Sequence, residues 1–427
     1  MSHARPLRTA LCTLSLLLLA LPAAAAVRLV NPTGACGGSP CHTDLQSAID
    51  ASAPGDLIGV QAGVYPLAAT VLVNRSVGIY GPQAGVNPLP SKGTTRVPGS
   101  ANEAVFDGGG TLGVLIRVLA DDVTIDGIEV RNGTGDLIES TTGVPTRGTR
   151  VRNCIVHDAT GDEGMQLRAV TDGVVECNHV YATAGDGINL CCTSVNGVIR
   201  YNEVHDIASE NAAIYVYSST GTVVEGNLVY NTTTNEGIKL GAKYGPDAGL
   251  AGGMVFNNTV HHTAQDGIAI YTSYAAASCN DVSHSTSENG GIYVAWAVSN
   301  VTITDNHVHD NVFDTAKWGD PAGIMIGTEP DAATITVSGN VLHGNVPGGV
   351  TNKAVAPLAA TGNWWGDASG PSGAGPGSGD AVSANVVFDP WLTSEPTHSC
   401  PAIGTCEGGN PTPVPSTTWG RLKTLYR

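Results

Sequence analysis

The chain has 427 residues, of which 55 are glycine and 13% are charged, and its acids outnumber lysine and arginine by 37 to 20. The resulting net charge of −17 excludes nucleic-acid binding as the main function, because that function needs a basic surface. It also argues against unaided binding of a polyanionic glycan, unless divalent cations bridge the two acidic surfaces.

Residues 1–26 have the features of a secretory signal peptide. Arg5 and Arg8 precede a nearly all-apolar run, and four alanines end at Ala26, where we expect cleavage. No later run reaches the roughly 18 apolar residues that a membrane-spanning helix needs. We therefore expect an exported protein without a transmembrane segment, secreted or at the cell surface, and monomeric.

A short helix is predicted near the start of the mature chain. Leu45, Ala48 and Ile49 recur at helical spacing, and either Thr43 or Asp44 can cap the first turn. Such a helix suits the end of a repetitive structure, where it covers apolar side chains that the first repeat leaves open.

A repeat then dominates the sequence. Asn178, Asn202 and Asn227 stand 24 and 25 residues apart, and each is followed by x-Val-His/Tyr or its like, a polar turn and an apolar-x-apolar triplet. Period-2 triplets separated by Gly and Asn indicate strands, not helices. The equivalent positions along the chain are Ile128, Cys154, Asn178, Asn202, Asn227, Asn258, Asn280, Asn306, Asn340 and Asn363.

Three short strands and three turns fit into one repeat of this length. The chain therefore coils, each strand lying parallel on its equivalent one turn earlier, about 4.8 Å away. Val, Ile and Leu side chains stack as columns inside the coil. The recurring Asn is expected at a bend, where it bonds along its own column and satisfies buried backbone groups. We predict an all-β protein, a parallel β-helix of about ten to twelve coils.

The repeats over residues 120–365 resemble the right-handed parallel β-helix superfamily, the pectin-lyase-like fold of carbohydrate-binding proteins and sugar hydrolases. The segment from Asp44 to Gly81 is similar to the opening of such proteins, in which a short helix caps the first coil. The resemblance implies a fold and an extracellular polysaccharide as partner, but no single activity, because lyases, hydrolases, epimerases and binders share it.

The domain boundaries follow from breaks in the repeat. We place the β-helix at residues 27–395, with a loop insertion at 82–100 and a closing segment at 363–392. Two long repeat steps predict further loops near residues 242–252 and 312–321, and loops on a rigid stack often carry function.

The end of the sequence changes character. Trp364, Trp365 and Trp391 can plug the last coil or stack on sugar, and the first alternative fits better. Residues 396–427 form a Pro/Thr-rich linker and a basic, aromatic tail, which is a sorting signal or a short turn docked on the solenoid.

Ten cysteines in an exported chain indicate disulfides. We expect two short-range bridges, Cys36–Cys41 and Cys400–Cys406. Cys154 occupies a repeat position and is expected to be a buried thiol. The pairing of the others stays open; adjacent Cys191 and Cys192 serve packing and turns, form a vicinal disulfide or bind a metal.

The middle residue of each apolar-x-apolar triplet is expected to face solvent and to form one column with its equivalents. Together with the residues two positions on, this surface is rich in Tyr, Asn and Gln, which suit sugar faces and hydroxyls. The candidate substrate-binding residues are Gln166, Asn189, Tyr215, Tyr217, Tyr271 and Tyr293.

Acids precede Gly in the turn before several of these strands. Two such carboxylates in adjacent coils, about 5 Å apart, either share a proton or hold a hard cation such as Ca²⁺. The alternative is that each simply accepts hydrogen bonds from its own turn. The candidate Ca²⁺ ligands are Glu163, Asp186, Glu236 and Asp266.

Lys239 stands in the middle of this face beside Glu236, and Arg168 lies on the same lane. In polysaccharide lyases of the fold that the chain resembles, a Lys or Arg abstracts the proton next to a uronate carboxylate while a cation stabilises the product anion. Lys239, Arg168 and Glu236 are the candidate catalytic residues on that basis. The alternative for Lys239 is an ion pair with Glu236, which favours the charged amine.

Histidines recur just after the repeat Asn, at His157, His205, His261, His309 and His343. Because some coils carry Tyr there instead, we interpret the position as structural and not as a metal stack.

The sequence leaves two hypotheses for the function: a secreted carbohydrate-active protein, lyase-like if it is an enzyme, and a non-catalytic surface scaffold or adhesin. The motifs expected of polygalacturonases and alginate epimerases are missing from it.

Overall fold

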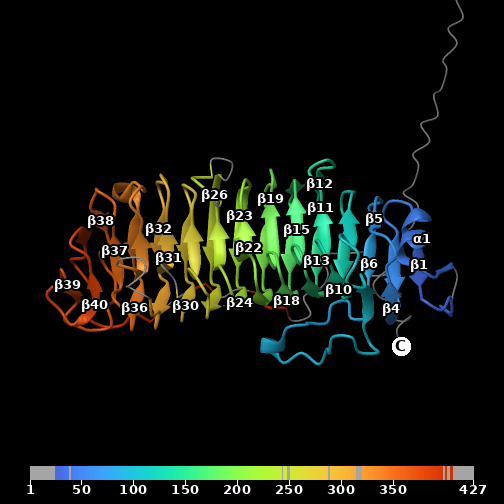
Figure 1. Ribbon diagram of the computed structural model, residues 1–427, viewed down its shortest axis with the longest axis horizontal. Helices are drawn as coiled ribbons and strands as arrows, with labels where there is room; N and C mark the ends of the chain where they lie inside the picture. Colours follow the sequence, from blue (N-terminus) through green and yellow to red (C-terminus); the bar gives the residue numbers. More distant parts are fainter. Residues whose placement is uncertain are drawn as a thin grey trace, which may run out of the picture.

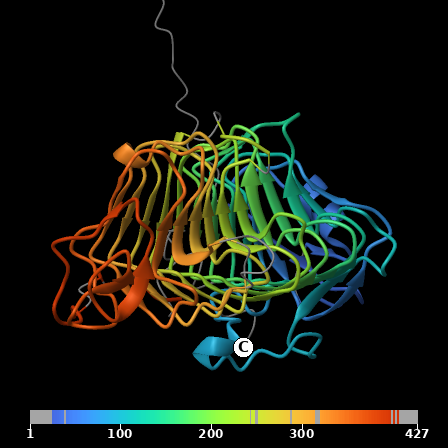
Figure 2. The same ribbon diagram turned by 60° about the vertical axis from the view of Figure 1, so that its left-hand side comes forward.

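A computed structural model describes residues 25–37, 40–242, 244–247, 251–286, 289–313, 320–397, 400–401 and 404–406. Three long parallel sheets run along the molecule, and each turn of the chain adds one strand to each of them in the order A, B, C (Figure 1). Turned by 60°, the view in Figure 2 shows successive strands side by side and pointing the same way. The predicted all-β parallel solenoid is confirmed.

Sheet A has fifteen strands in the described chain, starting beside the N-terminal helix. They are β2 (Cys41–His42), β1 (Val27–Val30), β3 (Leu57–Val60), β6 (Gly78–Tyr80), β9 (Thr124–Asp126), β13 (Arg150–Arg152), β17 (Val174–Glu176), β20 (Val198–Arg200), β23 (Thr220–Glu225), β26 (Ala251–Phe256), β29 (Ala276–Ser278), β32 (Thr302–Thr304), β35 (Thr336–Ser338), β38 (Leu358–Ala359) and β41 (Val386–Val387).

Sheet B has eleven strands and carries the recurring histidines. They are β4 (Gly63–Pro66), β7 (Ala104–Asp107), β10 (Glu129–Gly133), β14 (Ile155–Ala159), β18 (His179–Thr183), β21 (Glu203–Ile207), β24 (Leu228–Thr232), β27 (Thr259–His261), β30 (Asp281–Ser283), β33 (His307–His309) and β36 (Val341–His343).

Sheet C has thirteen strands and contains the apolar-x-apolar triplets. They are β5 (Val71–Val73), β8 (Ile116–Val118), β11 (Ile138–Ser140), β15 (Met165–Arg168), β19 (Ile188–Cys191), β22 (Ala212–Val216), β25 (Glu236–Leu240), β28 (Ile268–Ile270), β31 (Gly290–Val294), β34 (Ala322–Ile326), β37 (Val350–Asn352), β40 (Gly379–Val382) and β39 (Pro371–Gly373). A separate pair, β12 (Thr146–Arg147) and β16 (Val170–Thr171), extends two coils.

The N-terminal end is capped as the sequence predicts. Helix α1 (Leu45–Asp50) begins after Asp44, whose carboxylate accepts a hydrogen bond from the backbone N–H of Ser47 at 2.8 Å. Leu45, Ala48 and Ile49 are buried against the first coil. The helix thus removes from water the apolar side chains that an open solenoid end would expose.

The asparagine ladder is confirmed at the bend between sheets A and B. The Asn202 side chain donates to the Asn227 oxygen at 2.9 Å and to the Val175 carbonyl at 3.0 Å, and its own oxygen accepts from the Asn178 backbone at 2.9 Å. The same pattern repeats through Asn258, Asn280, Asn306, Asn340 and Asn363. Each buried amide thereby satisfies backbone groups that the sheets leave unpaired.

A single apolar core fills the coil. One column of sheet A illustrates it: Val151, Val175 and Ile199 are paired in register and fully buried. Cys154 is a buried free thiol, as expected, and burial raises its pKa to about 12. Trp365 is fully buried near the last coils, which agrees with a plug at that end.

The cysteines pair differently from the prediction at the C-terminal end. Cys36–Cys41 is confirmed, but the predicted Cys400–Cys406 bridge is wrong: Cys400 pairs with Cys279 and Cys406 with Cys177. Cys279 and Cys177 directly precede ladder asparagines and have left-handed φ values of 56° and 58°. The bend turns their side chains outward, where the returning C-terminal segment meets them.

Contacts between these two bridges trace the path of that segment. The Asn257 side chain donates to the Pro401 carbonyl at 3.4 Å, and the Gly404 N–H donates to the Tyr201 hydroxyl at 3.0 Å. Residues 400–401 and 404–406 therefore lie along the A–B bend in the order opposite to the growth of the solenoid. Adjacent Cys191 and Cys192 form a vicinal disulfide.

The predicted loop insertion and the segments near the two ends of the chain remain to be placed. The 82–100 insertion is a loop with one 3-10 turn, η1 (Pro90–Lys92), and lies below the solenoid in Figure 1. Its Arg96 forms a buried ion pair with Glu103 at 2.7 Å. A second 3-10 turn, η2 (Ala332–Thr334), precedes β35. Residues 1–24 of the proposed signal peptide and the tail beyond residue 406 lie outside the described residues. Within the described ranges, no helix combines the length and apolar character needed to cross a membrane.

Candidate functional site

The outward column of sheet C lies where the triplets predict, but it is not open to solvent as we expected. Gln166, Asn189, Tyr215 and Lys239 are paired in register across β15, β19, β22 and β25. They are only 2 to 4% exposed. Alternation fixes which face a side chain takes, whereas exposure depends on neighbours about 4.8 Å away in the next coils. Here those neighbours and the preceding turn cover the column.

Most members of this column are paired with the acid three residues earlier. Glu163 accepts from Gln166 at 3.0 Å, and Asp186 accepts from Asn189 at 2.6 Å. The β25 strand places Lys239 at the equivalent position, 2.9 Å from Glu236. The acids therefore serve as hydrogen-bond or ion-pair partners of the outward side chains three residues later. From the sequence we predicted this pairing for Lys239 and not for Gln166 and Asn189.

Lys239 is the one cation in this sequence of pairs, and it is enclosed. Its ammonium lies 5.1 Å from the ring centre of Tyr271 and 5.8 Å from that of Tyr215, one strand to either side. Both rings present a negative face to the charge. The Tyr271 hydroxyl also lies 3.4 Å from Glu236 Oε1. A carboxylate and two rings thus surround the Lys239 side-chain nitrogen.

A cavity of about 400 Å³ opens beside this ion pair. The second oxygen of Glu236, Oε2, is buried and finds no hydrogen-bond donor among the described residues. The lining residues come from three coils: Ala208, Ser209, Glu210, Thr234, Asn235, Glu236, Lys239, Tyr244, Gln265 and Tyr271. A buried carboxylate oxygen without a donor, next to a cavity, is a position where a ligand hydroxyl can bind.

Two residues in the lining of this cavity, Tyr244 and Ser209, were not predicted from the sequence. Tyr244 is 82% exposed and belongs to the loop that the long repeat step at 242–252 predicted. Ser209 lies on the opposite side and hydrogen-bonds Asp186. The repeat length was the available signal for Tyr244, but its position in the lining of the cavity beside Lys239 depends on tertiary structure.

The tyrosines of the face form two groups. Tyr215 and Tyr217 stack with ring centres 4.7 Å apart, and the Tyr217 hydroxyl lies 3.5 Å from Cys192 Sγ. Tyr271 and Tyr293 meet edge to face at 6.0 Å. Burial raises the pKa of Tyr271 strongly, and it raises that of Tyr293 to about 12, so both phenols stay protonated at neutral pH. Tyr217 and Tyr293 retain partial exposure and can contact a ligand.

Arg168 does not join Lys239. Three strand spacings separate β15 from β25, which is about 14 Å. Arg168 instead bonds Glu139 at 2.8 Å and lies 3.4 Å from Asp136, both on the coil before it. The two cations that the sequence placed on one lane therefore belong to separate sites.

Of the four proposed metal ligands, Glu163 is the one that belongs to a group of three acids close enough to hold an ion among the described residues. Glu163 gathers with Asp136 and Asp162, with candidate ligand oxygens within 4.8 Å of one another. Burial and the two neighbouring acids raise the pKa of Glu163, and burial together with Glu139 raises that of Asp136 to about 7. Asp186 is committed to Ser209 and Asn189, and Asp266 accepts from the Gly290 N–H at 3.1 Å. One acidic cluster thus replaces the predicted column.

This architecture defines the class of protein. A family description, the right handed beta helix region, matches residues 100–246 and 211–363, which overlap and together span more than half of the chain. The chain therefore belongs to this family of right-handed parallel β-helix proteins. No curated protein sequence matches it significantly.

Several solved structures are similar to this chain. The A-module of the mannuronan C-5 epimerase AlgE6 from Azotobacter vinelandii has a TM-score of 0.60 at 14% identity, covering 82% of this chain and 94% of that one. A DFA-IIIase from Arthrobacter chlorophenolicus A6, without its lid, has a TM-score of 0.49 at 16% identity, covering 80% and 91%. An alginate lyase from Paenibacillus sp. str. FPU-7 has 0.44 at 16%, covering 80% and 95%. Identities this low indicate a shared fold only.

Proposed function

We propose that this protein is secreted and acts on an extracellular polysaccharide, which binds across sheet C at the Lys239 cavity and is cleaved there by elimination. The observation that carries the proposal is the enclosed Lys239–Glu236 pair beside a cavity, with Glu236 Oε2 lacking a donor. The fold shared with a mannuronan epimerase supports a polysaccharide as the ligand class. The disulfides fit an oxidising compartment.

Elimination at a uronate needs a positive charge near the carboxylate, a group that takes the neighbouring carbon-bound proton, and a donor for the leaving oxygen. Lys239 is the positive charge. Glu236 and two rings hold its amine on three sides, so in this scheme Lys239 faces the substrate carboxylate and another group is the base. In this scheme Glu236 Oε2 takes the proton from the carbon next to the uronate carboxylate. The Tyr271 hydroxyl donates a proton to the leaving glycosidic oxygen.

We further propose that Ca²⁺ binds at Asp136, Asp162 and Glu163. These oxygens suit a hard cation, and Glu163 Oε2 is buried without a donor among the described residues. Calcium there would offset the acidity of the face and let an acidic glycan approach. Arg168, held by Asp136 and Glu139, would contact the same part of the glycan.

A non-catalytic scaffold or adhesin is the second candidate. It is favoured by the burial of the sheet C column, since Gln166, Asn189 and Tyr215 leave little surface for a glycan. In that case Lys239 and Glu236 only stabilise the stack.

The test is a panel of acidic and neutral polysaccharides incubated with the mature protein, with and without Ca²⁺. Release of unsaturated ends, followed by ultraviolet absorbance, supports the lyase proposal. Binding without cleavage selects the scaffold.

Variants then test the roles in the cavity. Lys239→Arg keeps the charge and the ion pair, so it should retain part of the activity if Lys239 stabilises charge; complete loss with intact folding would indicate that Lys239 is the base. Tyr244→Ala removes an exposed ring and should raise KM with little change in stability. Wild-type kinetics in both variants would contradict the site.

A further inference from the structure

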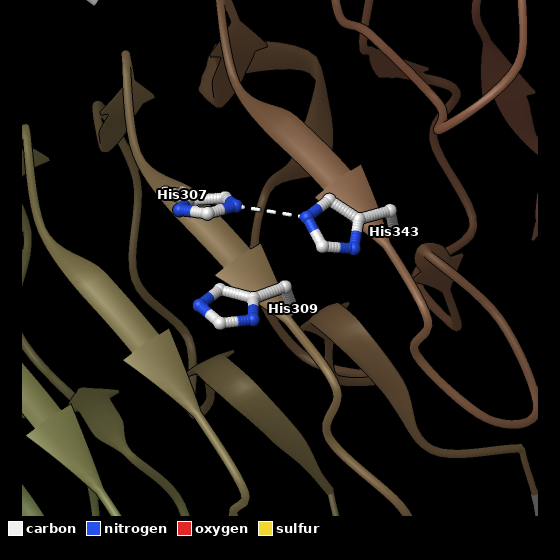
Figure 3. A group of neighbouring side chains, drawn as sticks. All are labelled: His307, His309 and His343. Atoms are coloured by element: carbon white, nitrogen blue, oxygen red, sulfur yellow. Dashed lines mark hydrogen bonds between the residues drawn. The ribbon is translucent and has the colours of Figure 1, made fainter.

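Three imidazoles gather on the outer face of sheet B, far from the Lys239 cavity. His307 and His309 alternate on β33 and therefore point the same way, and His343 on β36 is paired in register with His309. Figure 3 shows the three rings converging from these two neighbouring strands. We interpreted the His309 and His343 positions as structural, and the sequence pattern did not single out His307.

The distances within this group are short. Nε2 of His307 lies 2.9 Å from Nε2 of His343, and each of the three rings offers a nitrogen within 4.8 Å of the others. The ring centres of His307 and His309 are 4.0 Å apart. Two imidazole nitrogens at 2.9 Å cannot both present lone pairs, so a proton or a cation must lie between them.

Carboxylates stand behind the rings. Asp281, one coil earlier and in register with His307, lies 3.1 Å from His309 Nε2 and 3.7 Å from His307 Nδ1. Asp310 lies 2.8 Å from His309 Nδ1. A carboxylate on the far nitrogen of a ligating histidine orients the ring and strengthens it as a donor, and it offsets the charge of a bound ion.

We propose that His307, His309 and His343 form a binding site for a divalent transition-metal ion of the Zn²⁺ or Cu²⁺ type. The ion takes the place of the proton between His307 and His343, and His309 turns one nitrogen to it while the other keeps its carboxylate. The side chains of His307 and His309 are 31% and 17% exposed, so the fourth coordination position is open to water. Three imidazoles with one open position favour such ions over Ca²⁺, which prefers oxygen ligands.

The same molecule contains a matched pair that lacks the site. His179 on β18 and His205 on β21 have Nε2 atoms 2.8 Å apart, in the same diagonal arrangement as His307 and His343. Tyr181 stands where His309 would be, and Ile155 is in register with His179, where Asp281 would be. This pair has two imidazoles and neither the third ring nor that carboxylate.

The experiment is a titration of the full chain, free of any histidine tag and stripped with EDTA, with ZnCl₂ by calorimetry. One equivalent of Zn²⁺ should bind, and CaCl₂ should not displace it. His307→Gln and His343→Gln should each weaken binding by at least about tenfold, and Asp281→Asn by about 10–100-fold. The control His179→Gln should leave the affinity unchanged.

Two results would overturn the site: no stoichiometric Zn²⁺ binding by the wild-type chain, or equal weakening by His179→Gln and His343→Gln. Far-UV circular dichroism checks that each variant is folded. Zinc-edge X-ray absorption on the unaltered protein needs no variant. It should show nitrogen ligands at about 2.0–2.1 Å; a shell of oxygen alone would also overturn the proposal.

Discussion

Sheets B and C arise from one repeat, yet their outward columns have different chemistry. On sheet C the outward side chains Gln166, Asn189 and Lys239 are buried, and each is paired with the acid three residues earlier. On sheet B the column consists of aromatic rings stacked face to face at 4.6 to 5.3 Å: His157, Tyr181, His205, Tyr230 and His261.

The difference shows where each face can bind a ligand. A side chain that is already paired has few atoms free to bind a ligand. On sheet C the candidate binding atom is therefore Glu236 Oε2, which has no hydrogen-bond donor among the described residues. Stacked rings use their faces on one another and keep their edges free, so on sheet B the reactive position is where several ring edges meet, at His307 and His343. Buried electrostatics govern one face and ring edges the other.

The largest expected effect is on sheet C and comes from pH. Asp136 and Glu163 have pKa values raised above their ordinary ones by burial and neighbouring acids, Asp136 to about 7. The folded state therefore holds the protons of these two carboxyls more tightly than the unfolded state does. Their contribution to the free energy of unfolding is complete below about pH 4 and is lost as pH rises toward 7 and beyond. The melting temperature should fall over this range.

Two controls separate the proton from the cation. Asp136→Asn should flatten the pH dependence, and CaCl₂ should restore the melting temperature at pH 8 if Ca²⁺ replaces the proton. Identical melting at pH 5 and pH 8, with and without chelator, would remove both the shared proton and the calcium proposal.

The next effect tests the buried ion pair. Glu236→Gln leaves the Lys239 ammonium without its counter-charge and should lower the free energy of unfolding by about 3–5 kcal/mol, measured by urea denaturation. Glu236→Met combined with Lys239→Met should recover much of that loss. Glu210→Gln, on an exposed acid in the lining of the same cavity, serves as the control. A loss below about 1 kcal/mol would show that the pair behaves as a surface salt bridge.

The asparagine ladder, which serves both sheets, should show an intermediate effect. Asn202→Ala removes the acceptor of the Asn178 N–H and the donor to Val175, and should cost about 1–3 kcal/mol. Asn231→Ala, at an exposed asparagine of β24, is the comparison. Equal melting of wild type and Asn202→Ala would contradict the ladder's role.

The smallest effect is expected on sheet B. His205→Ala interrupts the ring stack between Tyr181 and Tyr230 and should cost about 0.5–1.5 kcal/mol, because partly exposed rings contribute little beyond their contact area. A loss as large as that of Glu236→Gln would mean that the ring column carries the solenoid's stability and would reverse the comparison.

The repeat could be predicted because every coil obeys the same local rule. Asn at the bend, alternating apolar residues and Gly in the turns are set by contacts with the identical position one coil away, so the positions of Asn202 and Asn227 were predicted correctly. The capping helix follows equally local rules.

Side-chain burial, disulfide pairing and the histidine group could not be predicted, because they depend on contacts between residues far apart in sequence. Lys239 was expected in solvent because alternation says nothing of neighbours in other coils. Cys400 and Cys406 were paired with each other because the return path of the C-terminal segment leaves no trace in spacing. His307 was overlooked because its neighbour His343 is 36 residues away in sequence, on the next strand of sheet B. In each case the missing information is a long-range contact.

The returning segment has a mechanical consequence. Because Cys406 is bonded to Cys177, tension applied between the start of the solenoid and residues beyond 406 passes directly from one cysteine to the other. The chain between these two cysteines, which are 229 positions apart in sequence, includes Lys239 and the three histidines; it lies off that covalent path and bears no direct load. A solenoid pulled from its two chain ends would thus stretch only in its first coils, and both candidate sites would keep their geometry under force.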